Sequence, residues 1–416
     1  MSTIIEEIIA RKIFNSRGEE TLEVDVITME GFGRASAPAG ASRGKAEAIP
    51  YPKGGVEQAI KKVDEVIAPE LIGMNADEQG MIDLCLHEID GTKDFRNIGG
   101  NTACAVSIAI AEAAATSYGI PLFQHLAGVL ANNLPFPLGN VLGGGKHTRG
   151  KSPDIQEFLV LPIKADKFSD AAKTNIDVNQ KVCSTLKKRD STFTGGKGDE
   201  GGWATKINNE DATEIVMVAC EQVSNESEVE CRVGIDMAAS TLWSPKENCY
   251  IYKRDDVKRD PGEQLDFVLH LIKKYGLVYV EDPFNEDDFE SFSQLTKKIK
   301  NCLICGDDLF VSNKERLAKG VKVGAANAII IKPNQVGTLT DAWETAKFAG
   351  KNQYTTVISH RSGETTSTQI AHLNVAFPCP IIKTGVVGGE RTAKINELIR
   401  IEEALGDRAK MSTLFI

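Results

Sequence analysis

The chain has 416 residues, of which 42% are hydrophobic and 25% are charged, and this composition is typical of an ordinary globular protein. Its formal net charge of −10 disfavours nucleic acid and anionic membranes as partners, and no early apolar run resembles a signal peptide or a membrane span. The nine cysteines are scattered, with no second pair to make a zinc motif. We therefore expect a cytoplasmic protein with reduced thiols.

The first part of the chain predicts a small α+β domain. Strand patterns lie at residues 3–14 and 20–29, and a turn at 30–33 leads to a third strand. Helical periodicity follows at residues 55–71, 76–89 and 102–118. Because the chain is too long for one small domain, we place a boundary at the linker-like residues 132–135. The predicted domains are residues 1–131 and residues 132–416.

Two glycine-rich segments interrupt these patterns. Residues 37–44 are small and glycine-rich, as in a loop that moves and lays backbone groups against a ligand, although a plain surface turn has the same composition. Residues 195–203 form a similar loop that carries Glu200. The second part of the chain otherwise alternates strands and helices, with predicted elements at residues 136–142, 156–161, 166–189, 210–225 and 390–404 and a hairpin near 249–253.

Six β-prone runs between residues 233 and 383 each end in a charged or titratable side chain. These ends are Asp236, Glu281, Asp307, Lys332, His360 and Lys383. From Glu281 onward they are 23–28 residues apart, which is the length of a strand, a helix and two loops. Chemical residues at the carboxyl ends of successive parallel strands build the active site of a (β/α)8 barrel. We predict an α/β chain with a barrel of this type, irregular in its first units, behind the α+β domain.

Three of these ends are carboxylates, which repel one another unless a cation holds them together. Oxygen-only ligation favours a hard ion, Mg²⁺ before Zn²⁺, at Asp236, Glu281 and Asp307. The alternative is a set of salt bridges to Lys332 and Lys383. A lysine next to cations and away from water has a lowered pKa and could take a proton. We expect Glu157 and Glu200, from the opposite side of the barrel, to hold or deliver one. The reaction class is removal of a proton beside a carboxylate, followed by loss of a leaving group.

Ordered motifs over nearly the whole length carry a resemblance to one family. They lie at residues 10–18, 40–44, 156–158, 198–202, 234–240, 281–284, 306–309, 332–335, 359–365, 382–385 and 400–403. With them the chain resembles the enolases, the phosphopyruvate hydratases of glycolysis, in their shorter archaeal form. Arg43 departs from the family, which usually has a small hydroxyl residue at that position.

The resemblance implies a role for each matching residue. Lys332 would take the C2 proton of 2-phosphoglycerate, and Glu200 would assist departure of the 3-hydroxyl, with Glu157 and His147 nearby. The residues implied to contact substrate are Gln156, Glu157, His360, Arg361, Ser362 and Lys383, of which Arg361 and Ser362 would grip the phosphate.

Two Mg²⁺ ions per active site follow from the same resemblance. Asp236, Glu281 and Asp307 would bind the first, and Ser42 would help to bind the second together with the substrate. The implied product is phosphoenolpyruvate, and the implied assembly is a homodimer or an octamer of dimers. Ion pairs between subunits would join Arg11 to Glu403 and Glu23 to Arg400.

Two other readings stay open on the residues alone. The chain could be another acid-sugar dehydratase or racemase of the same superfamily, although such an enzyme is not expected to carry both the 40–44 and 359–363 motifs. It could also be a non-catalytic scaffold or surface-binding protein. Loss of Lys332 or Glu200 would favour the scaffold, and both are present.

Overall fold

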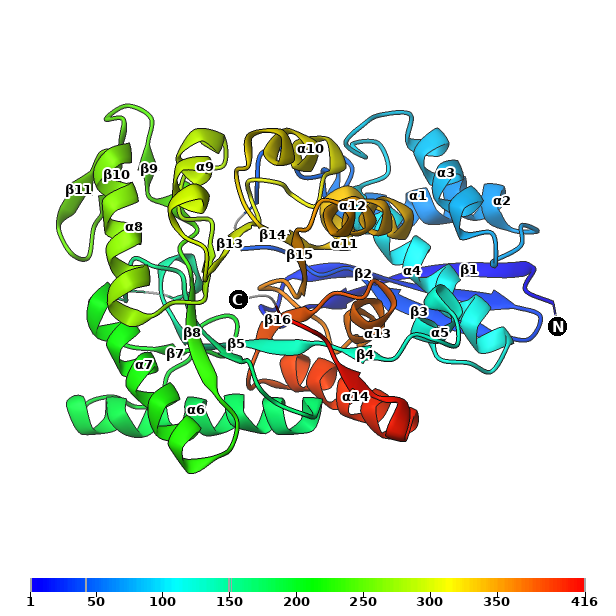
Figure 1. The fold of residues 1–416 in the computed structure, drawn as a ribbon. Helices are drawn as coiled ribbons and strands as arrows, with labels where there is room; N and C mark the ends of the chain where they lie inside the picture. The colour runs from blue at the N-terminus through cyan, green and yellow to red at the C-terminus, as the bar shows by residue number, and fades with distance from the viewer. Residues whose placement is uncertain (1, 42, 149, 151, 415–416) are drawn as a thin grey trace.

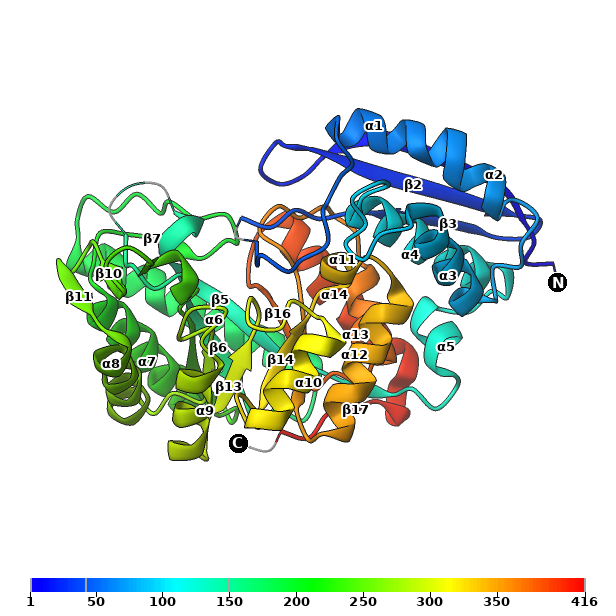
Figure 2. The same ribbon diagram turned by 90° about the horizontal axis from the view of Figure 1, so that it is seen from above.

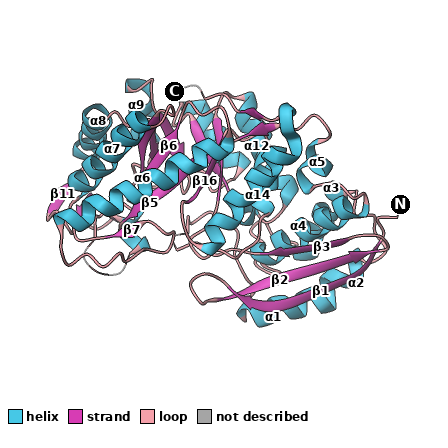
Figure 3. Ribbon diagram, turned by 90° about the horizontal axis from the view of Figure 1, so that it is seen from below, coloured by secondary structure: helices cyan, strands magenta, loops and turns pink. Residues whose placement is uncertain are grey.

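The computed structural model describes residues 2–41, 43–148, 150 and 152–414. Residues up to about 127 form a sheet with helices at one end of the molecule, and the remaining residues form a barrel beside it (Figure 1). The predicted strands are confirmed to within a few residues as β1 (Ile5–Phe14), β2 (Glu20–Thr28) and β3 (Phe32–Ser36), which pair antiparallel in that order. Figure 3 shows the three strands side by side, next to the barrel.

The helices of this part lie where periodicity predicts them, except the last, α5 (Leu122–Ala127), which was not predicted. They are α1 (Gly55–Lys62), η1 (Val63–Ile67), α2 (Ala68–Leu71), α3 (Gln79–Asp90), α4 (Gly100–Ser117) and α5 (Leu122–Ala127). The predicted helix over 55–71 is interrupted at η1 by one π-helical turn. Helix α4 packs directly on β2 and β3, because its alanines and Gly33 on β3 leave room for close approach. A Cβ on Gly33 would lie 2.0 Å from the carbonyl oxygen of Ala109.

The second part is a closed barrel of eight strands. In barrel order these are β5 (Phe136–Gly143), β6 (Glu157–Pro162), β8 (Cys231–Asp236), β12 (Tyr279–Glu281), β13 (Leu303–Gly306), β14 (Ala328–Ile331), β15 (Thr355–Ser359) and β16 (Ile381–Gly385). Pairing of β16 with β5 closes the ring. Strand β6 runs antiparallel to both of its neighbours, and this is the irregularity expected in the first units. Apolar side chains such as Leu138, Tyr279 and Ile330 form a separate buried cluster of barrel residues.

Helices surround the barrel (Figures 1 and 2). They are α6 (Phe168–Arg189), α7 (Asn209–Glu226), α8 (Pro261–Tyr275), α9 (Phe289–Lys298), α10 (Lys314–Val323), α11 (Pro333–Val336), α12 (Leu339–Lys351), α13 (Gln369–Ala376) and α14 (Gly389–Leu405). Local sequence sets their ends: α8 begins with Pro261 and a capping box between Asp260 and Glu263, and ends at Gly276 in the left-handed conformation. No helix among the described residues is long and apolar enough to cross a membrane.

Short elements complete the fold. The expected hairpin is a three-stranded sheet of β9 (Trp243–Ser244), β10 (Cys249–Tyr252) and β11 (Val257–Arg259). Strand β7 (Trp203–Ala204) extends the barrel sheet at β5, and the 3₁₀ turns are η2 (Gly145–His147), η3 (Ala239–Thr241) and η4 (Gly406–Arg408). The residues of the predicted linker also make a short strand pairing. They include β4 (Asn133–Leu134), which pairs with β17 (Lys410–Met411) near the end of the chain. Local composition could not show this partner, because it lies far away in the sequence.

Candidate active site

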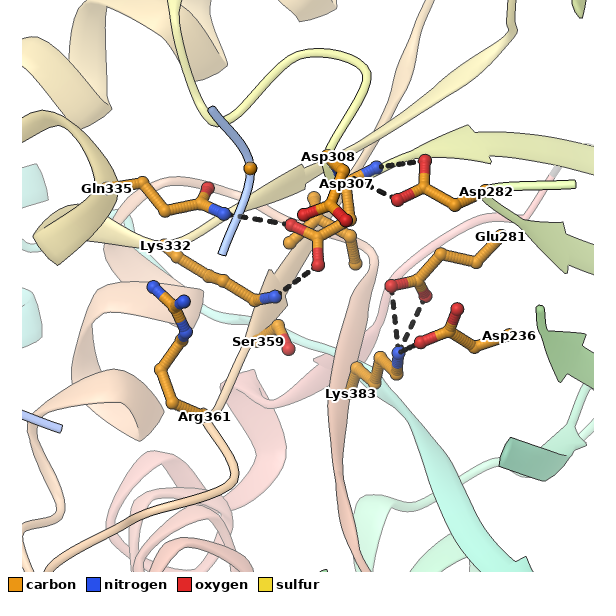
Figure 4. Close-up of polar contacts among 12 residues, drawn as sticks. Asp236, Glu281, Asp282, Asp307, Asp308, Lys332, Gln335, Ser359, Arg361 and Lys383 are labelled. Atoms are coloured by element: carbon orange, nitrogen blue, oxygen red, sulfur yellow. Dashed lines mark hydrogen bonds and ion pairs between the residues drawn. The ribbon is translucent and has the colours of Figure 1, made fainter. Parts of the chain in front are cut away.

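The ends of neighbouring barrel strands meet at the amino group of Lys383, on β16. Its Nζ lies 2.9 Å from Asp236 Oδ2, at the end of β8, and 2.8 Å from each carboxylate oxygen of Glu281, at the end of β12. Figure 4 shows Lys383 pointing at these two carboxylates. Glu157 Oε1 is 3.3 Å from the same Nζ. All four side chains are buried, so the cluster is a low-dielectric site with strong electrostatic coupling.

Glu157 reaches this cluster from a place that we did not predict. It does not come from the opposite side of the barrel: it begins β6, directly beside Asp236 in the antiparallel pair with β8. Because β6 runs the other way, its amino end lies at the mouth where the parallel strands finish. The preceding residue, Gln156, donates from Nε2 to Asp236 Oδ2 at 3.4 Å. Both residues therefore lie within the cluster that the strand ends predict.

A second ion pair joins Lys332 and Asp307, which follow β14 and β13. Lys332 Nζ donates to Asp307 Oδ2, and Gln335 Nε2 donates to Asp307 Oδ1 at 3.0 Å (Figure 4). Asp282 holds the turn in place, since its carboxylate accepts from the backbone N–H groups of Asp307 and Asp308 at 3.0 and 2.7 Å. The carboxylates Asp236, Glu281 and Asp307 are thus neutralised by the two lysines, which is the alternative raised above.

These pairs set the charge of the two lysines. Burial is the largest single effect on Lys332 and lowers its pKa, but the nearby carboxylates, Asp307 first and Glu281 after it, together outweigh burial and raise the pKa. The pKa of Lys383 is likewise raised well above its ordinary value, because Asp236, Glu157 and Glu281 outweigh burial. The lowered lysine pKa that we expect beside bound cations stays a prediction. Both lysines are ammonium groups in this arrangement.

Glu200 lies in a second polar cluster, built by the 198–202 loop and the segment after β15. Glu200 Oε2 is 3.0 Å from His360 Nε2, and Ser362 Oγ donates to Glu200 Oε1 at 3.2 Å. His147 Nε2 is 3.2 Å from Ser362 Oγ, and Asn140 on β5 donates to Glu200 Oε2 at 3.3 Å. All of these side chains are buried, so each polar contact is made without competition from water.

Glycines in the 198–202 loop allow its backbone to pack closely against β5 and the residues after β16. A Cβ on Gly201, whose φ is +82°, would lie 2.3 Å from the Val387 carbonyl oxygen. A Cβ on Gly202 would lie 2.6 Å from Asn140 Oδ1. Any larger residue would push the loop, and Glu200 with it, out of the site.

The surroundings of Glu157 and Glu200 shift their pKa values in opposite directions. Burial, together with the charge of Glu200, raises the pKa of Glu157 well above its usual value. Burial also acts on Glu200, but His147 and His360 outweigh it and hold the pKa of Glu200 well below its usual value. Burial and mutual repulsion thus favour a proton on Glu157 over one on Glu200. His147 lies between them, 3.6 Å from each.

Arg361 follows His360 and makes a bidentate pair with Glu47, a residue of the segment that leads out of the 37–44 loop. Nη1 and Nη2 of Arg361 both lie 3.1 Å from Glu47 Oε2. Ser42, the predicted ligand of a second metal, lies outside the described residues. Arg43 next to it is exposed, and its Nη2 donates to the Ala48 carbonyl oxygen at 3.3 Å.

One small cavity of about 20 Å³ touches almost every predicted site residue. Its lining is Gly40, Ala41, His147, Gln156, Glu157, Glu200, Asp236, Asp307, Lys332, Ser359, His360, Arg361, Ser362 and Lys383. This volume holds about one water molecule, so a substrate can enter only when the covering 40–41 segment or the side chains move.

Comparison with known proteins assigns the family. The enolase C-terminal TIM barrel domain matches residues 131–414, and the enolase N-terminal domain matches residues 5–126. Enolases of the archaea Methanosphaera stadtmanae and Methanothermobacter thermautotrophicus are 54% and 53% identical to the chain, each over 97% of it and 98% of their own length. The enolase of Pyrobaculum aerophilum is 47% identical over 98% of both chains.

The chain belongs to the enolase family. Enolases are lyases, so the comparisons confirm the family and the enzyme class that the motifs indicate. They also confirm the TIM barrel behind an N-terminal domain.

Enolases are metal-dependent, and the donor set of this member fits a hard divalent cation. Asp236, Glu281 and Asp307 stand on three adjacent strand ends, are buried, and offer only oxygen ligands. They do not form the tightest groups, however. Among the described residues, the groups that converge within 4.8 Å are Asp282 with Asp307 and Asp308, and His147 with Glu157 and Glu200. Within the predicted triad, Lys383 pairs with Asp236 and Glu281, whereas Asp307 pairs with Lys332.

Several residues of this enolase site escaped prediction. Asp282, Asp308, Gln335, Glu47 and Arg391 all contact or support predicted residues. Asp282 and Asp308 directly follow predicted ligands, so each doubled acid was an available signal. Glu47 and Arg391 gave none, because their partners lie on distant segments.

Proposed function

We propose that this chain is an enolase that reversibly dehydrates 2-phosphoglycerate to phosphoenolpyruvate and water, in glycolysis and gluconeogenesis. The carrying observation is the single cavity that both lysines, Glu157, Glu200, His360 and the metal-type carboxylates Asp236 and Asp307 line together. This set combines a base, an acid and groups that can stabilise the second negative charge on the substrate carboxylate. Elimination beside a carboxylate requires all three.

Lys332 is the proposed base for the C2 proton. It is buried and held by Asp307, which is itself a proposed metal ligand. While that carboxylate is its partner, Lys332 keeps its proton. A cation held by Asp307 would offset the carboxylate charge that raises the pKa of Lys332, and Lys332 would then be able to accept the proton from C2.

Glu200 is the proposed group that assists departure of the 3-hydroxyl. Burial, together with the charge of Glu200, raises the pKa of the neighbouring Glu157 well above its usual value, and His147 stands 3.6 Å from a carboxylate oxygen of each. We assign Glu157 as the group that holds the proton for the leaving hydroxide, and Glu200 as the group that orients the hydroxyl. Gln156, His360 and Lys383 complete the contacts to substrate.

The proposed cofactor is Mg²⁺, two ions per site, the second bound with substrate. Asp236, Glu281 and Asp307 would hold the first, and Ser42 would help to hold the second. The cations would stabilise the second negative charge that forms on the substrate carboxylate. Arg361 and Ser362 would grip the phosphate, which suits a planar guanidinium beside a hydroxyl donor.

We also propose the domain division 1–131 and 132–416, a cytoplasmic location, and a homodimer or an octamer of dimers. Within one chain, Arg11 already pairs with Glu23 at 2.9 Å and also contacts Asp25. The proposed contacts from Arg11 to Glu403 and from Glu23 to Arg400 of a second subunit would extend this cluster. Light scattering during size exclusion distinguishes the assemblies.

Ultraviolet absorbance tests the activity directly. With 2-phosphoglycerate and Mg²⁺, absorbance of the conjugated enol phosphate should rise, and EDTA should stop the rise. No rise with excess Mg²⁺ and folded protein would reject the enolase proposal. Turnover of an acid sugar instead would favour another dehydratase of the superfamily.

A further inference from the structure

Arg391, in the first turn of α14, is completely buried and belongs to none of the motifs that indicate the active site. Its guanidinium donates to three backbone carbonyl oxygens from two separate loops. Nη1 lies 2.6 Å from the oxygen of Arg361, and Nη2 lies 2.6 Å from that of Ser362 and 2.9 Å from that of Asp199. One side chain thus ties the loop of Glu200 to the loop of His360, Arg361 and Ser362.

A fourth contact of Arg391 reaches the imidazole of His360. Nη1 is 2.8 Å from His360 Nδ1, and the backbone N–H of Gly385 also points at Nδ1, at 3.4 Å. An arginine and a backbone amide can only donate hydrogen bonds. The Thr384 hydroxyl, 3.4 Å from Nδ1, can also donate to it. Because the nearest partner of Nδ1 is the Arg391 guanidinium, Nδ1 is an acceptor, which leaves the single ring proton of a neutral imidazole on Nε2.

The other ring nitrogen then has a fixed role. Nε2–H faces Glu200 Oε2 at 3.0 Å, so His360 donates to the carboxylate and Glu200 accepts. Ser362 Oγ donates to the other oxygen of the same carboxylate at 3.2 Å. With donors on both oxygens, Glu200 is held as an ionised acceptor in one orientation.

We propose that Arg391 is a positioning residue that fixes His360 in its Nε2–H tautomer and thereby orients the Glu200 carboxylate for the reaction. The catalytic part of this inference rests on the proposed function, and the tautomer part does not. Arg391 touches neither the proposed reacting atoms nor the proposed cations. It acts through His360 and through the loop carbonyls. A planar fork of five donors can serve all four acceptors at once, whereas a lysine has three donors and no such geometry.

The matched control is Lys394, three residues along the same helix. It is also buried, pairs with Glu364 at 2.8 Å and donates to the Thr365 carbonyl oxygen at 2.6 Å. It therefore supports the same loop as Arg391, but none of its hydrogen bonds or ion pairs reaches His360 or Glu200. A purely structural role for the α14 basic residues predicts the same result for both positions.

The first measurement is the ring ¹⁵N spectrum of the protein labelled at its six histidines, with His360 assigned from His360→Gln. We expect wild type to show a protonated Nε2 and an unprotonated Nδ1 at His360 near neutral pH. Arg391→Lys and Arg391→Met should convert this to a mixture of tautomers or to imidazolium, and Lys394→Met should not. A protonated Nδ1 in folded wild type overturns the inference, whether or not any variant folds.

The second measurement separates positioning from stability. In Arg391→Lys, kcat should fall about tenfold or more while KM changes less than about threefold, because the bond to Glu200 matters in the transition state. Equal losses in Arg391→Lys and Lys394→Met, with an unchanged His360 spectrum, would overturn the proposal. If wild type shows the expected tautomer but no dehydratase activity, the proposed function fails and the tautomer assignment stands.

Discussion

Lys332 and Lys383 each occupy the position of a counter-ion for carboxylates that we assign to metal binding. Lys383 spans Asp236 and Glu281, and Lys332 is held by Asp307. Leaving any of these buried charges unpaired would cost several kcal/mol, so the protein without cations needs the lysines as ammonium groups. In the mechanism that we propose, Lys332 would become a base only after Asp307 gains another partner. Charge balance at single residues would then couple catalysis to cation binding.

Lys332→Ala should abolish turnover. The base acts mainly in the transition state, so binding of Mg²⁺ and of substrate should largely persist. Exchange of the C2 hydrogen with solvent deuterium, followed by NMR, should disappear together with dehydration. Lys314→Ala, at a surface pair with Glu344, serves as the control for expression and folding. Retention of a tenth or more of wild-type kcat would remove Lys332 from the role of base.

Glu281→Gln should give a different defect. The amide keeps the shape of the side chain but removes one of three charges that hold the first cation. We expect activity to be low at ordinary Mg²⁺ concentrations and to recover in part as Mg²⁺ is raised. A titration of rate against Mg²⁺ measures this shift, with Glu290→Gln on α9 as the matched surface control. Wild-type activity without a changed Mg²⁺ requirement would show that Glu281 is not a ligand.

At the scale of elements, the strand ends could be read from the sequence because each is local. A β-prone run, a terminal charged residue and a proline or glycine lie within a few residues of one another, as in residues 278–283. The direction of β6 has no local signature, since an antiparallel strand reads like a parallel one. Hence Glu157 was predicted as a site residue, while its place beside Asp236 was not. Pairing of β4 with β17 escaped prediction for the same reason.

The covering loop gives a prediction at this scale, because Arg43 departs from the family pattern there. Its side chain is exposed and donates to the Ala48 carbonyl oxygen, so the structure favours an outward orientation. Arg43→Thr should then change kcat/KM less than about threefold, under ~0.7 kcal/mol. The Mg²⁺ concentration for half-maximal rate should stay the same. A tenfold loss of kcat/KM with weaker inhibition by inorganic phosphate would instead place Arg43 on the substrate.

At the scale of the whole molecule, contacts between the N-terminal part and the barrel complete the site, and local sequence patterns cannot reveal such contacts. The backbones of Ala39 and Gly363 pair across this junction, and Asn334 donates to the Pro38 carbonyl oxygen. Arg361 and Glu47 meet although 314 residues separate them. Their pairing depends on how the two parts pack, and neither residue type nor spacing reveals it. The site is therefore predictable in its strand-end chemistry and unpredictable in the side chains that hold its loops.

The buried site also gives the whole molecule a pH dependence. Burial, opposed by Glu200 and aided by Arg391, lowers the pKa of His360 to about 4, whereas an unfolded histidine has a pKa of about 6.5. Between these values the unfolded chain binds a proton that the folded chain does not. The free energy of unfolding therefore falls as pH drops from about 6.5 to 4, by up to about 3 kcal/mol from this one group.

Replacing His360 should remove that contribution. In His360→Gln, the loss of stability relative to wild type should be large at pH 7 and much smaller at pH 4.5. At pH 4.5 the wild-type free energy of unfolding is already reduced, because the unfolded chain binds a proton that the folded protein does not. Urea midpoints of both proteins at the two pH values, in EDTA, measure this difference. His147 contributes with the same sign, because burial lowers its pKa too, so some acid sensitivity should remain in the variant. The exposed His270→Gln serves as the control for a histidine-to-glutamine change at the surface. An equal destabilisation of His360→Gln at pH 7 and pH 4.5 would mean that His360 is not held neutral in the folded protein.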